Sequence, residues 1–166
     1  MPCRRSPARI ADGTAAVGER YGRRMGSQQV TAEAITAMAA ELFEGAGNTC
    51  AEVGPGYAIA RRDVQPGEIR PGGFVSGPTQ FGVADAALWY MTFVGIERIE
   101  PMAMTSELSM RFLRPAVGDV MWAKATVDVA GRRSVVGTVT VWTTDESKPC
   151  SVGQGTYMLP HAPTTF

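Results

Sequence analysis

One stretch of sequence decides the fold: Val75-Ser76-Gly77-Pro78-Thr79-Gln80-Phe81-Gly82-Val83-Ala84-Asp85-Ala86-Ala87-Leu88-Trp89-Tyr90-Met91-Thr92-Phe93-Val94-Gly95. Between Arg70 and Glu97 its only charged residue is Asp85. A helix on the surface of a globular protein has an apolar stripe and a charged face, whereas this segment is apolar nearly all the way round. It is too short, and too often interrupted by polar residues and glycine, to cross a bilayer. We therefore predict a helix that other structure encloses.

The start of this helix is clearly marked in the sequence. Ser76 or Gly77 can serve as the N-cap, and Pro78 lies in the first turn, where a missing N–H does not weaken the helix. Asp85 follows about two turns later. Because an unpartnered carboxylate is costly to bury, two interpretations stay open. Asp85 bonds a neighbouring strand or a second subunit, or it is a general base or nucleophile near a helix N-terminus whose free N–H groups bind an oxyanion.

Composition narrows the class of protein. The 166 residues suffice for one domain with a sizeable core, and 16 basic residues balance 16 acidic ones, which argues against a nucleic-acid partner. The three cysteines Cys3, Cys50 and Cys150 are widely spaced, as in a reducing cytosol, and predict neither disulfides nor a zinc site. The single histidine, His161, lies near the chain end, which argues against a Ser-His-Asp or Cys-His mechanism and excludes a histidine-rich metal site.

The N-terminal segment differs from the rest. Residues 1–29 carry six arginines against two acidic residues and have no apolar periodicity or apolar signal-peptide core. We expect a disordered basic extension there and a single domain over residues 30–166.

Periodicity in the remaining chain predicts a helix and several strands. A helix is expected over residues 31–44, capped by Thr31 and ended by Gly45. Two-fold alternation and turn residues then predict strands over residues 57–64, 102–113, 120–129, 134–144 and 151–159. The last of these strands, joined by short turns, predict an antiparallel meander. The fold class is α+β, with an antiparallel sheet wrapped around one central helix.

Three motifs in this order carry a family resemblance. Ser76-Gly77-Pro78 is followed, nine residues after Ser76, by Asp85; Phe112-Leu113-Arg114-Pro115-Ala116-Val117-Gly118-Asp119 ends a strand; and Gly131-Arg132-Arg133-Ser134-Val135-Val136 forms a hairpin. Over about residues 50–160 the chain resembles hotdog-fold acyl-CoA thioesterases of the phenylacetic-acid-degradation (PaaI-like) type, in the 4-hydroxybenzoyl-CoA thioesterase (4HBT) superfamily.

The resemblance implies roles for three residues. Asp85 is the acid that attacks the thioester or activates water, and the Gly77 backbone N–H binds the oxyanion. Thr105 aligns with a Ser or Thr that helps to place the water from the partner subunit. The family further implies a homodimer or a dimer of dimers, with the central helices side by side, and no cofactor beyond the coenzyme A of the substrate.

The sequence departs from the family pattern at three positions. Ser76 replaces a His, Pro78 replaces a Gly, and Arg70 stands where an Asn is frequent. Ser76 can still cap the helix, and the donor that Pro78 removes would not serve the helix. An Arg70 guanidinium near Asp85 favours an ion pair that either polarises a carbonyl or holds the acid away from the reaction.

Other candidate substrate contacts have a structural alternative. Arg132 and Arg133 are either a solvated hairpin turn or a site for the phosphates of coenzyme A. Phe81 and Leu88 are candidates for an acyl tunnel, whereas Trp89 and Tyr90 are expected to pack in the core or a dimer contact.

We therefore expect a cytoplasmic acyl-CoA thioesterase for a small or medium acyl group, aliphatic or aromatic, with Asp85 as nucleophile or general base. No metal, nucleic acid or membrane is expected to take part. The alternative is a non-catalytic acyl-CoA or hydrophobic-ligand binding protein of the same fold, which the altered tripeptide and Arg70 favour. A hotdog-fold hydratase is a third reading, against which the missing histidine argues.

Overall fold

A computed structural model describes residues 29–161, and the extension expected over residues 1–29 falls almost entirely outside this range. The described chain contains two α-helices, a 3-10 turn and eight strands: α2 (Ala32–Leu42), β1 (Asn48–Gly54), β2 (Tyr57–Asp63), η1 (Pro66–Glu68), β3 (Ile69–Arg70), β4 (Phe74–Val75), α3 (Gly77–Gly95), β5 (Met104–Phe112), β6 (Val120–Ala130), β7 (Ser134–Trp142) and β8 (Ser151–Met158).

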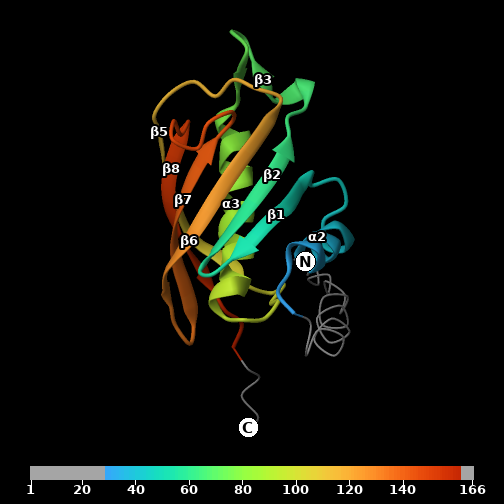
Figure 1. Ribbon diagram of the computed structural model, residues 1–166, viewed down its shortest axis with the longest axis vertical. Helices are drawn as coiled ribbons and strands as arrows, with labels where there is room; N and C mark the ends of the chain where they lie inside the picture. Colours follow the sequence, from blue (N-terminus) through green and yellow to red (C-terminus); the bar gives the residue numbers. More distant parts are fainter. Residues whose placement is uncertain (1–28, 162–166) are drawn as a thin grey trace, which may run out of the picture.

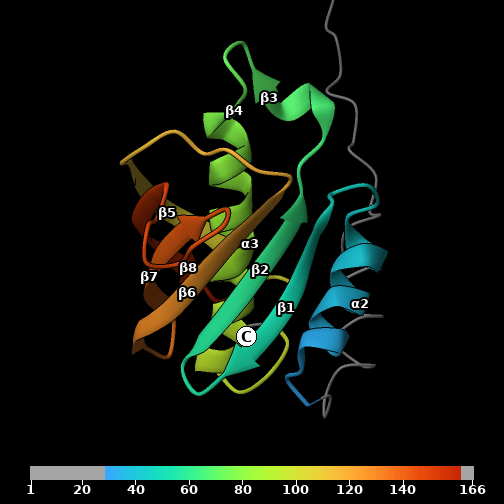
Figure 2. The ribbon, with the colours of Figure 1, turned by 45° about the horizontal axis from the view of Figure 1, so that its top comes forward.

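An antiparallel six-stranded sheet curls around α3, as Figures 1 and 2 show. The strand order is β1-β2-β6-β7-β8-β5. The predicted fold class, an α+β sheet wrapped around one helix, is confirmed.

Two details of the sheet were not predicted from the sequence. β5 does not join the meander beside β6, because residues 113–119 carry the chain across to the far edge, where β5 pairs with β8. In this crossing the Leu113 N–H bonds the Cys150 carbonyl at 2.8 Å. Strand β1 was not predicted, since its register shifts between Cys50 and Glu52 and a bulge breaks the alternation on which strand prediction depends.

The central helix is enclosed as its composition predicted. Val83, Leu88, Met91 and Phe93 have no exposed surface, and burial of each such side chain stabilises the fold by about 1.5–3 kcal/mol. Glycine in the sheet leaves space for these helix side chains. A Cβ added at Gly155 would lie 2.8 Å from Cδ1 of Leu88 and 3.0 Å from the Glu107 carbonyl oxygen.

The first turn of α3 is fixed by a buried polar chain. Ser76 is the N-cap and accepts a bond from the Thr79 N–H at 3.3 Å. Gln80 donates to the Val75 carbonyl at 3.3 Å and accepts from the Ser151 hydroxyl at 3.0 Å. Since Gln80 and Ser151 are buried, each satisfies the other's polar group and β8 holds the helix start in place.

Helix α2 lies beside β1 at the sheet edge (Figure 2). Thr31 caps it as predicted, and Ile35 and Met38 face the core. Thr36 fastens it to β1, accepting from the Cys50 N–H at 2.9 Å and donating to the Cys50 carbonyl at 3.1 Å. Neither helix of the described region has both the length and the apolar character needed to cross a membrane.

Candidate active site

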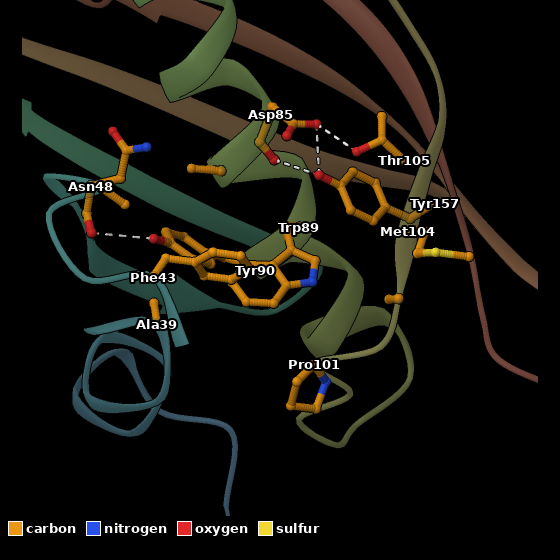
Figure 3. A pocket seen from close by; sticks show the side chains of 13 residues that line it. Ala39, Phe43, Asn48, Asp85, Trp89, Tyr90, Pro101, Met104, Thr105 and Tyr157 are labelled. Carbon is orange, nitrogen blue, oxygen red and sulfur yellow. Dashed lines mark hydrogen bonds between the residues drawn. The ribbon is translucent and has the colours of Figure 1, made fainter. Parts of the chain in front are cut away.

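The Asp85 carboxylate accepts two hydroxyl hydrogen bonds on one oxygen. The Tyr157 hydroxyl lies 2.7 Å from Oδ1 and the Thr105 hydroxyl 2.9 Å from the same atom. Figure 3 shows the two side chains reaching Asp85 from the sheet. Asp85 is half-buried on α3. Asp85 therefore bonds neighbouring strands, which is the first of the two interpretations drawn from the sequence. Its carboxylate is nevertheless only partly buried, so this bonding leaves the second interpretation, a catalytic acid, open.

Strand pairing explains why the two hydroxyls meet. Thr105 on β5 lies directly opposite Tyr157 on β8, and the β5 register shifts between Thr105 and Glu107. Such bulges redirect side chains and are frequent beside active sites. Thr105 was expected to act from the partner subunit, but here it bonds Asp85 of its own chain.

Tyr157 is the buried member of the pair, with only 3% of its surface exposed. Burial, together with the negative charge of Asp85, raises the pKa of Tyr157. The phenol therefore keeps its proton at any physiological pH and remains a hydrogen-bond donor.

A cavity of about 440 Å³ opens beside Asp85. Its walls come from α3, from the end of α2 with the chain that follows, from the loop before β5, and from β8. The ring of Phe43 meets Trp89 edge-on, with centroids 5.6 Å apart. The lining is mainly aromatic and apolar and consists of Ala39, Phe43, Ala46, Asn48, Asp85, Ala86, Trp89, Tyr90, Pro101, Ala103, Met104, Thr105 and Tyr157. A concave apolar wall with a few converging polar groups is typical of small-molecule sites.

Gly77 does not reach this cavity within one chain. It begins α3 eight positions before Asp85, which is about 12 Å along the helix axis at 1.5 Å per residue. Among residues 29–161 no backbone acceptor outside the helix bonds its N–H, as is usual for the first turn. The donor expected to bind the oxyanion is therefore distant from the acid of the same chain.

Four other predicted substrate contacts also lie outside the cavity. Ser76 serves as the helix cap, and Arg70 is exposed on the short β3–β4 ribbon, with no ion pair to Asp85 within the described chain. Phe81 packs beside Phe112 with ring centroids 6.2 Å apart. Leu88 has no exposed surface and lies in the core, so it does not line a tunnel in this structure.

Arg132 and Arg133 are exposed in the β6–β7 hairpin. This hairpin is at the same end of the sheet as the site, since Val135 on β7 pairs with Tyr157, which in turn pairs with Thr105. At about 4.8 Å per strand, β7 is about 10 Å from β5. A guanidinium nitrogen of Arg133 lies 2.7 Å from Nε2 of His161.

Sequence reasoning missed the four aromatic residues that line the cavity: Phe43, Trp89, Tyr90 and Tyr157. Trp89 and Tyr90 are expected from the sequence to pack, and they do, but both also line the cavity. Alternation in the last strand places Tyr157 on the same face as Gly155 and was a usable signal. No group of three or more potential metal ligands occurs in the described part of the chain.

The model of the thioesterase superfamily (4HBT) matches residues 72–150, which span α3 and strands β5 to β7. The fold is shared with a candidate thioesterase from Silicibacter sp. TM1040, at 25% identity and a TM-score of 0.70, over 82% of this chain and 96% of that one. Residues 72–150 thus resemble the thioesterase superfamily, and the described chain shares the hotdog fold.

Other solved structures share this fold. The Escherichia coli PaaI protein of the phenylacetic acid degradation operon is 20% identical, with a TM-score of 0.64, over 76% of this chain and 92% of that one. A thioesterase family protein from Silicibacter pomeroyi is 21% identical, with a TM-score of 0.67, over 77% and 96%. No curated protein sequence matches the chain with significance. The resemblance to hotdog thioesterases is thus confirmed, and thioester hydrolysis is the activity of this superfamily.

Proposed function

We propose that this protein hydrolyses the thioester of an acyl-CoA, with Asp85 as general base or nucleophile. The observation that carries the proposal is the Asp85 carboxylate, held by Thr105 and Tyr157 at the wall of an apolar cavity. A half-buried acid with fixed orientation beside an acyl-sized cavity has the geometry that base catalysis requires.

Asp85 can bring about hydrolysis by two routes, as a general base or as a nucleophile. As a general base, Asp85 takes a proton from water while the water oxygen attacks the carbonyl carbon. The tetrahedral oxyanion then collapses, the C–S bond breaks, and the proton passes to the leaving thiolate. As a nucleophile, the carboxylate itself expels the thiolate, and water then hydrolyses the resulting anhydride. Both routes need donors for the oxyanion.

We assign the oxyanion donor to the Gly77 N–H of a second copy of the chain. Gly77 lies about 12 Å from Asp85 along its own helix, so it can complete the site only if another α3 runs alongside in the opposite direction. Arg70 lies at the same end, in the ribbon just before α3, and would approach the same site. A homodimer, alone or paired into a tetramer, is therefore part of the proposal.

The two ends of the substrate would meet different surfaces. The acyl group, small or medium and aliphatic or aromatic, enters the cavity whose wall includes Phe43 and Trp89. Arg132 and Arg133 are exposed at the same end of the sheet and suit the coenzyme A phosphates. Replacing both by alanine is then expected to raise KM for acyl-CoA but not for the acyl-pantetheine ester, which lacks the nucleotide. An equal effect on both esters would remove these arginines from substrate binding.

The test is release of free thiol from a panel of aliphatic and aromatic acyl-CoAs. Wild type and Asp85→Asn are compared, with Asp128→Asn on the exposed part of β6 as the matched control. We expect turnover by wild type and the control and its loss in Asp85→Asn. Turnover of no ester by wild type, with a coenzyme A ester still bound, would instead support the non-catalytic binding protein.

A further inference from the structure

The hydroxyl of Tyr157 lies within hydrogen-bond distance of two oxygen atoms of Asp85. It lies 2.7 Å from the carboxylate Oδ1 and 3.0 Å from the Asp85 backbone carbonyl oxygen. A phenol has a single hydrogen to donate, and both acceptors that it bonds belong to Asp85. Tyr157 therefore restrains Asp85 at the backbone and the side chain together, and its proton is not free for a substrate oxyanion.

The second donor leaves one carboxylate oxygen free. Thr105 also bonds Oδ1, at 2.9 Å, and within residues 29–161 no group donates to Oδ2. Two donors on one oxygen fix the plane of a carboxylate, because rotation about the bond to Cγ would break both. Asp85 lines the cavity, so the oxygen without a donor is the one available for reaction.

We infer that Tyr157 is a positioning residue: together with Thr105 it holds Oδ1 of Asp85 and thereby makes Oδ2 the oxygen that takes the proton from water or attacks the thioester. This inference rests on the proposed function of Asp85. Tyr157 contributes more to this restraint than Thr105, because Tyr157 is buried whereas Thr105 is exposed.

The test begins with Tyr157→Phe, which removes the hydroxyl and keeps the ring. Misplacement of a catalytic group by about 1 Å can lower a rate by about a hundredfold, so we expect kcat to fall about tenfold to a hundredfold. KM is expected to change little, because the ring still lines the cavity. The matched control is Tyr57→Phe in the β1–β2 hairpin, whose hydroxyl bonds Glu52 and not Asp85. An unchanged kcat in Tyr157→Phe, with wild type active, would overturn the inference.

A double variant separates positioning from direct chemistry. If Tyr157 acts through Asp85, adding Tyr157→Phe to Asp85→Asn leaves the residual rate unchanged, because the group to be positioned is already lost. A further loss equal to that seen in wild type would mean that Tyr157 acts on the substrate itself, and the inference would be wrong.

A measurement that does not depend on enzyme activity, the NMR chemical shift of Tyr157, distinguishes this inference from the proposed function. In protein labelled with ¹³C at tyrosine Cζ, the resonance missing from Tyr157→Phe identifies Tyr157. We expect it to move in Asp85→Asn, while that of Tyr57 stays in place. A Tyr157 resonance at the same position in Asp85→Asn and in wild type would overturn the inference. If the resonance moves in Asp85→Asn but the wild type hydrolyses no ester, only the proposed function is contradicted.

Discussion

Thr105 and Tyr157 face each other across strands β5 and β8 and donate to the same oxygen of Asp85. The pair joins the free edge strand to the central helix, so the acid is oriented by the fold of a single chain. What a single chain does not bring to the acid is the amide of Gly77. The carboxylate is thus positioned within one protomer, whereas we propose that the oxyanion donor comes from a second protomer.

Removing the Gly77 N–H tests the oxyanion assignment. Gly77→Pro deletes this donor, and proline is well accepted at the first position of a helix. The φ of −63° and ψ of 152° at Ser76 suit the residue before a proline. We expect kcat to fall by about 10²–10³, as for loss of one oxyanion donor.

Gly77→Ala is the matched variant, because it keeps the N–H. Its Cβ would lie at an ordinary 3.5 Å from the Phe112 ring. Steady-state kinetics should show a much smaller loss for alanine than for proline. Equal losses in the two variants would mean that the backbone donor is not what matters at this position.

Mixing two inactive variants tests whether the site is shared. In a two-fold dimer, Asp85→Asn and Gly77→Pro chains form one doubly defective site and one intact site. Random exchange of subunits should then restore about one quarter of wild-type activity. Each variant alone, refolded in the same way, is the control, and a mixture no more active than the two separate samples would argue against a site built from two chains.

Close packing of the sheet on α3 predicts opposite effects at two glycines. Gly155→Ala places a Cβ against Leu88 and the Glu107 carbonyl, and we expect it to lower the free energy of unfolding by about 1–3 kcal/mol. Gly82→Ala lies on an exposed part of α3 with open space around the added Cβ. It should raise stability by about 0.5–1 kcal/mol. Urea unfolding measures both, and equal effects would contradict the packing described.

Stability is expected to fall at alkaline pH. Burial raises the pKa of Cys50 from 9.0 to about 12, so the unfolded chain loses this proton at lower pH than the folded one. The free energy of unfolding therefore decreases as pH rises above about 9 and continues to decrease up to about 12. Urea titrations at several pH values should show this decrease, and a shallower one in Cys50→Ala. The same slope in both proteins would exclude Cys50 as a cause.

Local patterns in the sequence predicted the parts of the fold that depend on local physics. The near absence of charge around Asp85 predicted the enclosed α3, and strict alternation predicted β7, whose residues Val135, Val139 and Val141 face the core. In β6 the register shifts between Val127 and Val129, and Val129 is exposed although it continues the apolar alternation of Met121, Ala123 and Ala125.

The site was less predictable because its members are far apart in sequence. Asp85 stood out as a lone carboxylate, but its contact with Tyr157 depends on which strand pairs with β5. The crossing at residues 113–119 determines that pairing, and no local pattern records it. The cavity wall at Phe43 likewise depends on where the end of α2 meets α3.

The most direct test of the central claim combines turnover and binding on the same samples. Wild type and Asp85→Asn are assayed for thiol release from the preferred acyl-CoA and titrated with the matching coenzyme A thioether, which cannot be hydrolysed. We predict that kcat falls by about a thousandfold or more in the variant while the thioether binds equally well to both. Undiminished thiol release by Asp85→Asn would contradict the claim that this carboxylate carries the reaction.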